Sequence, residues 1–527
     1  MRKSSVPVLA TIALVIGAVA PAVGQLVDRT LAPNAANEGI AKSLLEQIGA
    51  GRGDVLTPQS SAFIVARDPF RAIRRGRQLF QRKFTRAQGQ GPVAGDGAGD
   101  VQTNLAIGAG LADSCAACHG RPRGSAGFGG DVATRPDSRD APHLFGLGLK
   151  EMLADEMTSD LRAIRAAVVA ETAASGHPAT KPLVSKGVQF GSITANVGGG
   201  VDTSAVEGVN PDLRVRPFFA HGDTASIREF VVGALNNEMG LQAVDPELYA
   251  AAHSGARFTT PAGMVLDGST DRVEGPLAAD AAADPDGDGV ANEIPTSLVD
   301  YLEFYLLNYF KPGSYEQTHE ATRGRSVMER IGCTACHRPN LPIAHDRRVA
   351  DVETAYDAER GIFNNLFATA TLRHDTVDDG SGLPSLKPPR RQPFLVANIF
   401  TDFKRHDVGP AFYERNYDGT TRTAFLTTPL WGVGSTAPYG HDGRSITLTE
   451  VIRRHGGEAQ AARDAFEALS QPERNALLAF LQSLVLFPPD DTASNLNAGN
   501  RAAPGFPQFG HGSIKLTVLF NNPADPE

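Results

Sequence analysis

The chain has 527 residues, a formal net charge of −9 and a pI of about 5.8, and 41% of its residues are hydrophobic. The acidic balance argues against nucleic acid as a partner, because domains that bind nucleic acid carry basic patches. The length predicts roughly two or three domains, and 55 glycines with 35 prolines predict that much of the chain is loop.

The N-terminus has the pattern of an export signal. Arg2 and Lys3 form a short basic region, residues 6–20 are apolar but too few to span a bilayer, and the small residues 22–24 resemble a cleavage site. We therefore predict that residues 1–24 are a signal peptide and that the mature chain is periplasmic or secreted. No later apolar run is long enough for a transmembrane segment.

The sequence contains an internal repeat. Residues 75–80 resemble residues 323–328, and each copy predicts a short helix that begins at its glycine and precedes one of the two cysteine motifs described below. In the first copy an insertion over about residues 86–110 separates this helix from its motif. Pro122 and Pro339 follow the two motifs and predict the end of a short helix.

All four cysteines of the chain fall in two copies of one pattern, C-x-x-C-H. The copies are Cys115-Ala116-Ala117-Cys118-His119 and Cys333-Thr334-Ala335-Cys336-His337. This is the attachment motif of c-type haem, in which both thiols bond to the porphyrin and the histidine binds the iron. The sequence therefore predicts two covalently bound haem c groups. Covalent haem attachment takes place outside the bacterial cytoplasm, which agrees with an export signal.

Two other interpretations of a C-x-x-C pair were weighed. A zinc site needs four nearby ligands, and the two motifs lie far apart in the sequence. A thioredoxin-like redox pair would follow a strand in a βαβ pattern, which the sequence around both motifs lacks. The histidine directly after each second cysteine favours haem.

The repeat and the motifs together predict a mainly α fold with two cytochrome c-like haem lobes and long loops and insertions. We place the N-terminal lobe with its insertions at residues 25–315, the C-terminal lobe at 316–489 and a surface tail at 490–527. Within the first lobe, residues 185–215 and 250–295 are expected to be long loops or insertions.

Two helices are predicted near the end of the second lobe. Residues 447–450 have the form of a capping box, and Gly456 and Gly457 mark the end of that helix. Residues 470–473 begin another helix. Its apolar positions recur at helical spacing and predict a stripe that packs on the core: Leu477, Leu478, Leu481 and Leu484.

The second half also carries motifs that point to a family. These are TDFKRHD at 401–407, TPLWG at 428–432, HDGR at 441–444 and HGGEA at 455–459. With the two haem motifs, they are similar to the di-haem oxidoreductase family of the bacterial di-haem cytochrome c peroxidase superfamily. The resemblance covers most of the mature chain. It implies a mostly helical fold in which one haem brings electrons in and the other meets the oxidant.

The resemblance implies a second axial ligand for the C-terminal haem. In the superfamily a methionine lies fourteen residues after the histidine of HDG, and from His441 this count reaches His455. The second haem would then be held by His337 and His455, which lowers its potential relative to a methionine ligand. One alternative is that His455 caps its helix as a cation. The main competing ligand is His406.

The N-terminal haem departs from the family pattern. The superfamily often has a histidine about sixteen residues past the attachment histidine, where this chain has Arg135. Residues 139–142 resemble the family's R-N-x-P segment, and counting back from them reaches Asp131. His143 is the nearest histidine in the sequence, with a plain loop residue as its alternative. We therefore expect the first haem to be open or weakly ligated by water, and such an iron binds peroxide or dioxygen.

An open iron needs a base that moves the protons of peroxide. In the superfamily a Glu-Met pair provides it, and the stretch from Phe219 to Met239 resembles that region, which makes Glu238 the candidate base. The alternative is a surface glutamate on a helix. The family's tryptophan between the haems is replaced by Ala220. Trp431, the single tryptophan, is either a substitute electron relay or a buried core residue.

The resemblance further implies a calcium site between the lobes, built from Asp140, Thr436 and Pro438. A carboxylate at 140, in place of the family's amide, suits a hard cation. Separately, residues 284–289 have the first ligand positions and the glycine of an EF-hand loop, but position twelve is Pro295 rather than glutamate. We weigh calcium in that loop against an acidic turn without an ion.

The expected function is that of a periplasmic di-haem c-type oxidoreductase, first of all a peroxidase. It would reduce hydrogen peroxide with electrons from a small cytochrome c or cupredoxin. The alternatives are a haem-dependent oxygenase that uses dioxygen on an apolar substrate and a non-enzymatic di-haem electron carrier. Related enzymes that oxidise residues of another protein are a weaker option, because they have tyrosine on the second haem where this chain has His455.

Overall fold

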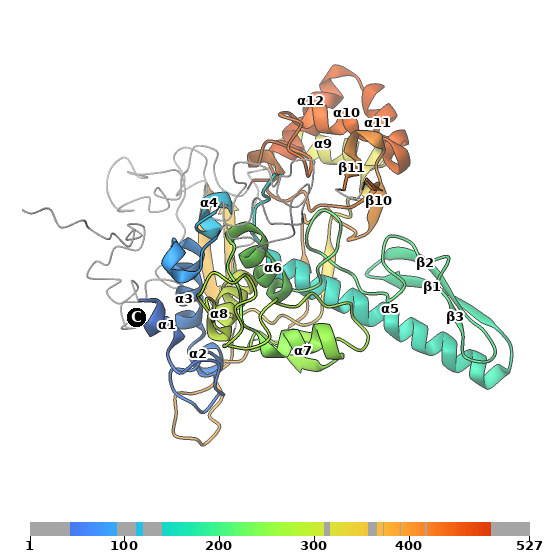
Figure 1. The fold of residues 1–527 in the computed structure, drawn as a ribbon. Helices are drawn as coiled ribbons and strands as arrows, with labels where there is room; N and C mark the ends of the chain where they lie inside the picture. The colour runs from blue at the N-terminus through green and yellow to red at the C-terminus, as the bar shows by residue number, and fades with distance from the viewer. Residues whose placement is uncertain are drawn as a thin grey trace, which may run out of the picture.

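A computed structural model describes most of the chain between residues 43 and 485. The described ranges are 43–91, 112–119, 140–309, 317–356, 366–372, 374–389, 392–416 and 419–485. The predicted signal peptide, the predicted tail and the positions Pro122, Asp131 and Arg135 lie outside these ranges. The predicted lobe boundary at 315/316 does as well. Over the described ranges helices are the main regular structure and several small sheets accompany them (Figure 1), in line with the mainly α part of the predicted fold class.

Most helices of the first half gather in one body, in which α3 packs against α8, while α5 runs outward from it (Figure 1). Their bounds are α1 Leu44–Ile48, α2 Ser61–Arg67, α3 Pro69–Gln81, α4 Cys115–His119, α5 Leu147–Ser175, α6 Ile227–Met239, α7 Pro246–Ser254 and α8 Thr296–Leu307. Gly76 lies at the crossing of α3 and α8, where a Cβ atom would overlap the backbone oxygen of Tyr301. Glycine is therefore required by close helix packing.

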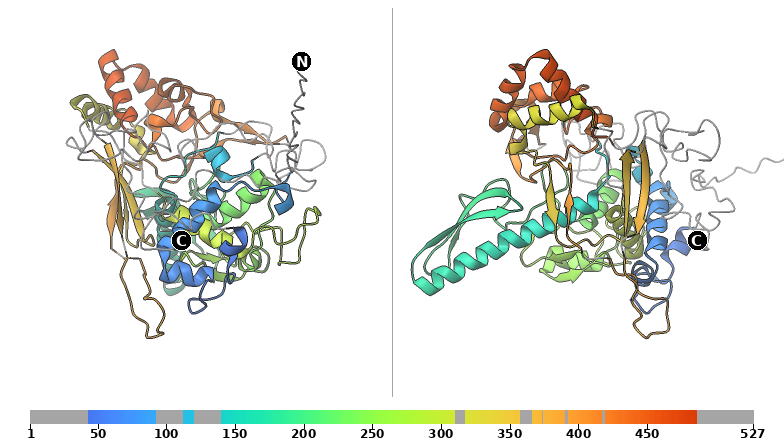
Figure 2. Two further views of the ribbon diagram at one scale, coloured as in Figure 1. Left: turned by 90° about the vertical axis from the view of Figure 1, so that its left-hand side faces the viewer. Right: turned by 180° about the vertical axis from the view of Figure 1, so that it is seen from behind.

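The helices of the second half form a separate group, and the views in Figure 2 show the same separation. They are α9 His319–Arg330, α10 Leu448–Arg454, α11 Gln460–Glu467 and α12 Gln471–Gln482. Here α9 packs against α12, and a Cβ atom at Gly324 would overlap the backbone oxygen of Ala476. The same glycine-mediated crossing therefore occurs in both halves.

This crossing corrects one detail of the predicted repeat. A helix does precede each C-x-x-C-H motif, but neither helix begins at its glycine. Gly76 and Gly324 lie inside α3 and α9, because each is needed where a second helix approaches. The helices begin earlier, at the N-caps Asp68 and Thr318, whose side chains accept backbone hydrogen bonds.

A long arm projects from the first half (Figures 1 and 2). It consists of α5 and an antiparallel sheet of order β1-β2-β3, with β1 Ala179–Ser185, β2 Val188–Ala195 and β3 Val201–Asp202. Val188, Phe190 and Ile193 are buried in one apolar cluster with residues of α5. The prediction that residues 185–215 form a loop is therefore wrong for β2 and β3, whose apolar positions pack on a helix.

The other strands form short antiparallel pairs. They are β4 Arg257–Thr259 with β5 Val265–Asp267, β6 Leu341–Ile343 with β9 Phe394–Val396, β7 Ala350–Tyr356 with β8 Leu366–Leu372, β10 Arg405–Asp407 with β13 Ala424–Leu426, and β11 Glu414–Arg415 with β12 Thr421–Arg422. The expected loop at 250–295 holds the end of α7 and the β4–β5 pair. Its remainder, from residue 268, is irregular as predicted.

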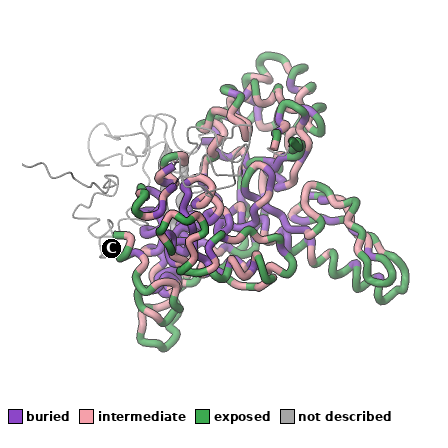
Figure 3. The backbone as a smooth tube through the Cα atoms, viewed as in Figure 1, coloured by how far each residue is buried: buried purple, intermediate pink, exposed green. Residues whose placement is uncertain are grey.

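The core is divided among three apolar clusters, and Figure 3 shows buried backbone concentrated inside the body while the far end of the arm is mostly exposed. The first cluster surrounds α3, α6 and α8, the second joins α5 to its sheet, and the third lies between α9 and α12. The predicted capping box of α10 and the predicted start of α12 are confirmed, α12 has a capping box as well, and Leu477, Leu481 and Leu484 are buried.

A buried ionic group joins α6 to α8 in the first half. Arg228 pairs with Asp245, Asp300 and Glu303, and all four side chains are almost fully excluded from solvent. Removing one partner of such a group leaves uncompensated buried charge.

Of the helices that the structure describes, none combines the length and apolar character that crossing a bilayer requires.

Candidate haem sites

A single cavity of about 1300 Å³ contains both C-x-x-C-H motifs. Cys115, Cys118 and His119 lie on α4, and Cys333 begins the 3-10 helix η3 (Cys333–Ala335), with Cys336 and His337 directly after it. Ligand pockets commonly measure 300–1,000 Å³, so this one exceeds the usual size for one small molecule. The cavity therefore has room for more than one large prosthetic group.

The first motif histidine is oriented by a backbone carbonyl. Nδ1 of His119 donates to the oxygen of Pro142 over 2.7 Å. A ring nitrogen that carries this hydrogen bond holds the proton, which leaves Nε2 as the metal-binding nitrogen. Burial lowers the pKa of His119, so the imidazole is neutral near pH 7, the form that binds a metal ion.

The second motif histidine is held in the same way. Nδ1 of His337 donates to the oxygen of Phe400 over 3.1 Å. Burial, together with the nearby His455, lowers the pKa of His337 to about 4. Two motifs far apart in the sequence therefore present their histidines with the same tautomer and the same free nitrogen.

His455 lies on the wall of the cavity at the C-cap of α10. Its Nδ1 donates to the oxygen of Val451 over 2.7 Å, which leaves Nε2 as the nitrogen for a metal. Burial lowers its pKa as well, so the ring is neutral and does not act as a cationic helix cap. His455 and His337 line the same cavity and are close enough for their charges to interact. The role of His455 as a second axial ligand stays a prediction.

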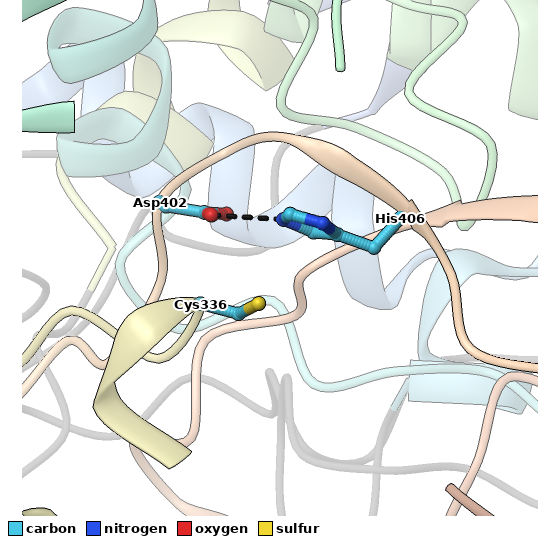
Figure 4. Close-up of side chains that lie close together, drawn as sticks. All are labelled: Cys336, Asp402 and His406. Atoms are coloured by element: carbon cyan, nitrogen blue, oxygen red, sulfur yellow. Dashed lines mark hydrogen bonds and ion pairs between the residues drawn. The ribbon is translucent and has the colours of Figure 1, made fainter. Parts of the chain in front are cut away.

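The competing ligand His406 has both ring nitrogens hydrogen-bonded to carboxylates, and Figure 4 shows the bond to Asp402. Nε2 lies 2.9 Å from Asp402 and Nδ1 lies 2.7 Å from Glu458. Burial alone would lower the pKa of His406, but the bonds to Asp402, Cys336 and Glu458 outweigh it and raise the pKa to about 11. A protonated ring has no lone pair for iron, so the structure favours His455 over His406.

Cys336, Asp402 and His406 are also close enough to one another to be ligands of one metal ion. A structural zinc site takes four ligands, and among the residues that the structure describes this cluster offers three.

The thiol pKa values argue against a redox pair. Burial raises the pKa of Cys115 to about 12 and that of Cys333 to about 11, whereas reactive cysteines have lowered values.

Glu238 lies on the last turn of α6 and lines the same cavity. The backbone oxygen of Glu238 accepts a hydrogen bond of 3.2 Å from Ala112, three residues before Cys115. This contact holds the end of α6 beside the first motif. Glu238 is partly buried rather than on an open surface, and its role as the base stays a prediction.

The predicted calcium ligands Asp140, Thr436 and Pro438 all line the cavity. Asp140 donates its backbone N–H to the oxygen of His441 over 3.0 Å, and its side chain lies near Pro438 and Gly443. Thr436 lines the same region. Burial raises the pKa of Asp140 to about 6.

The second predicted calcium site is the acidic loop, in which the carboxylates of Asp284, Asp286 and Asp288 lie close together. Calcium stays a prediction at both places.

Sequence reasoning underestimated His143. Nε2 of His143 donates to the oxygen of Trp431 over 3.1 Å, and its buried Nδ1 has no hydrogen-bond partner among the described residues. Burial and the nearby charge of Lys150 lower its pKa to about 3, and His119 adds to the shift. Trp431 is 3% exposed and borders the cavity, so it is at once a core residue and a neighbour of the sites.

A second group that the sequence did not reveal surrounds Glu414. Nε2 of His221 and Nε2 of His441 each lie 3.4 Å from the same carboxylate oxygen of Glu414. The ring of Phe425 stacks on His441 with 4.3 Å between centroids. His441 is the member of this group that a sequence motif, HDGR, contains. The other members, His221, Glu414 and Phe425, come from other segments of the chain, so no local pattern reveals them.

Comparison with known proteins places the second half in a described family. Residues 346–484 match the family model "Di-haem oxidoreductase, putative peroxidase". This range contains the TDFKRHD, TPLWG, HDGR and HGGEA motifs and ends with the stripe of α12. It begins after the second C-x-x-C-H motif, so the family match and the haem motifs are separate observations.

Curated relatives carry the name cytochrome-c peroxidase. The chain is 32% identical to IdrP2 of Pseudomonas sp. strain SCT over 34% of its own length and 42% of that protein. It is 31% identical to IdrP2 of Denitromonas iodatirespirans over 29% of this chain and 36% of that protein. IdrP1 of the same organism is 29% identical over 32% and 41%, respectively. The chain thus spans about two fifths of the length of these relatives.

Among solved structures, hydrazine synthase of Kuenenia stuttgartiensis aligns with 82% of this chain and 94% of its own, at 15% identity and a TM-score of 0.31. That score is too low to indicate a shared fold. The family match and the named relatives agree with the resemblance drawn from the C-terminal motifs. Residues 346–484 of this chain therefore match the di-haem oxidoreductase family model, and about a third of the chain is similar to proteins named cytochrome-c peroxidase.

Proposed function

We propose that this chain is an exported di-haem c-type peroxidase that reduces hydrogen peroxide with electrons from a small redox protein. One observation carries the proposal: a single cavity contains two C-x-x-C-H motifs whose histidines each keep one nitrogen for a metal. The signal-like residues 1–24 support export to the periplasm or beyond.

The residues fit two covalently bound haem groups. Cys115 and Cys118 would hold the first porphyrin, with His119 on its iron. Cys333 and Cys336 would hold the second, between His337 and His455. When bound, each iron supplies the one-electron redox chemistry of the reaction. The cavity walls supply the orientation of the ligands and exclude bulk water.

We propose further that the two halves are two haem lobes of related design. In each half a helix precedes the motif and crosses a second helix at a glycine, α3 on α8 at Gly76 and α9 on α12 at Gly324. This repetition supports a common architecture around each motif, since both crossings require the same absence of a side chain.

The proposed reaction is H2O2 + 2 e⁻ + 2 H⁺ → 2 H2O. A general base has to take a proton from one peroxide oxygen and return it to the other as the O–O bond breaks. Glu238 is the proposed base, because it lines the cavity and its backbone oxygen accepts a hydrogen bond from Ala112, three residues before Cys115. The electrons would come from a small cytochrome c or cupredoxin, in line with the name cytochrome-c peroxidase of the relatives.

Calcium is a secondary part of the proposal. Asp140 lies beside Pro438, and Thr436 lines the same wall, so a hard cation there would join the first half to the second. Its role would be to fix the segment 436–443 against residue 140. We assign it no part in the reaction.

The test compares Glu238→Gln with Glu274→Gln, a more exposed glutamate that lines the same cavity and that we place outside the reaction. Peroxide turnover is measured with a reduced cytochrome c as donor, on proteins that carry both haems. We expect Glu238→Gln to lower turnover by roughly 10²- to 10⁴-fold, while Glu274→Gln stays close to the wild type.

Equal turnover in the wild type and Glu238→Gln would remove Glu238 from the reaction. A wild type without peroxide turnover would overturn the proposed function itself. Oxygen uptake coupled to oxidation of an apolar compound would then identify the oxygenase, and electron exchange without either activity would identify the carrier.

A further inference from the structure

We propose that a continuous path of covalent and hydrogen bonds joins the two motif histidines, His119 and His337, and carries electrons between the two haem sites. The inference rests on the proposed function, since it assumes a haem at each motif. It concerns how the polypeptide couples the sites, and its elements are all described backbone and side-chain groups.

The path starts at the first site. Nδ1–H of His119 donates to the oxygen of Pro142 over 2.7 Å. The peptide bond leads from Pro142 directly to His143, whose Nε2–H donates to the backbone oxygen of Trp431 over 3.1 Å. A loop residue of the first half is thus bonded to the TPLWG segment of the second half.

From Trp431 the path goes back one residue along the backbone and crosses to a neighbouring segment. The N–H of Leu430 donates to the oxygen of Ile399 over 3.0 Å. The next residue is Phe400, whose oxygen accepts the 3.1 Å hydrogen bond from Nδ1 of His337. Four hydrogen bonds and short covalent runs therefore connect one motif histidine to the other.

The middle of the path is dry and rigid. Ile399, Phe400 and Trp431 are 0%, 1% and 3% exposed. The Trp431 ring lies so close to Gly146 that a Cβ atom there would overlap it. The Phe400 ring packs edge-on against Phe480 with 5.6 Å between centroids. Electronic coupling falls off more slowly through bonds than through space, so a fixed path of this kind favours transfer along it.

The orientation of His143 supports its place in the path. A neutral imidazole carries one proton, and His143 donates its proton from Nε2 to Trp431 while the buried Nδ1 has no hydrogen-bond partner among the described residues. Within the described ranges, the hydrogen bond to Trp431 is therefore the one that orients the ring of His143. The backbone oxygens of Pro142 and Phe400, which fix the tautomers of His119 and His337, are the first and last acceptors of this path.

The electron count of the transfer balances. In each transit the C-terminal site is oxidised by one electron and the N-terminal site is reduced by one electron. No bond is broken and no proton moves along the path, because every N–H stays with its donor. Reduction of one peroxide needs two transits, with both electrons coming from the external donor.

The path makes a distinction that mutants can test. It uses the backbone of Trp431 and the side chain of His143, so the indole ring itself is not needed. His143→Phe keeps an aromatic ring but loses the donor. His143→Gln restores an N–H donor. Trp431→Phe keeps the backbone carbonyl and removes the indole.

The experiment measures the rate of intramolecular electron transfer after photochemical one-electron reduction of the di-haem protein, without peroxide. Haem content and the absorption and EPR spectra of both sites serve as controls for intact ligation. We expect His143→Phe to slow the transfer by roughly 10- to 100-fold, the usual effect of losing an outer-shell partner. His143→Gln should recover most of the rate, and Trp431→Phe should stay near the wild type.

A wild-type rate in His143→Phe would overturn the path, and so would a slow Trp431→Phe beside a fast His143→Phe, which would assign the transfer to the indole. Because the rate is measured without peroxide, a protein with no peroxidase activity would still give a decisive result. Failure of the proposed function and failure of the path are therefore separate outcomes.

Discussion

The two C-x-x-C-H sites are alike on the side of the motif histidine and differ on the opposite side. His119 and His337 each donate Nδ1–H to a backbone carbonyl. The second site has His455 within electrostatic reach of its motif histidine, whereas Glu238 lies near the first. The repeated part orients the motif histidine, and the part that differs is where the proposed function separates an electron-transfer site from a peroxide site.

The largest effect is expected from removing one pair of thiols at a time. Replacing Cys115 and Cys118 with serine should remove the first haem and leave the second, because attachment depends on both thioether bonds of one motif. Replacing Cys333 and Cys336 should do the reverse. The intact mass of each exported variant gives the count, and loss of both haems from one variant would show that the sites do not form independently.

The next effect concerns the helix crossings that the two halves share. Gly324→Ala and Gly76→Ala should each destabilise the protein by about 1–3 kcal/mol or more, because the new Cβ atom overlaps a backbone oxygen. Ser326→Ala, on the exposed face of α9, is the control and should change stability by less than about 0.5 kcal/mol. Denaturant unfolding measures all three. A neutral Gly324→Ala would mean that the halves are not built on the same crossing.

A smaller and more local effect is expected at the second site. His455→Met should raise the reduction potential of the C-terminal haem, by a fraction of the roughly 0.8 V range that axial ligands span, and leave the other potential unchanged. His406→Asn is the matched control, since its nitrogens already bind carboxylates. Spectroelectrochemical titration distinguishes them. A shift in His406→Asn without one in His455→Met would exchange their roles.

The smallest effect is a pH dependence confined to the second half. The folded-state pKa of His406 is raised to about 11 from an ordinary value of 6.5, because its carboxylate hydrogen bonds outweigh burial. Protonated His406 therefore stabilises the fold fully below pH 6.5, and this contribution is lost as the pH rises through about 11. The stability difference between the wild type and His406→Asn should shrink over that interval. A constant difference would contradict the charged state of His406.

Local features of the fold and site were predictable from the sequence, and long-range ones were not. The motifs, the capping boxes at Thr447 and Ser470 and the leucine stripe of α12 each depend on residues within a few positions of one another. The helix crossing at Gly76 depends on Tyr301, and the bond from His143 depends on Trp431. No local pattern announces such partners. The sheet of the arm was missed because its apolar alternation is interrupted by Gly191 and Ser192.

The central claim is that two porphyrins are covalently bonded to this chain, one at each cysteine pair. Intact-mass measurement of the exported protein, together with metal analysis, tests it most directly. The account predicts the mass of the chain plus two haem groups and two iron atoms per chain. A mass without added porphyrin, or zinc in place of iron, would contradict it.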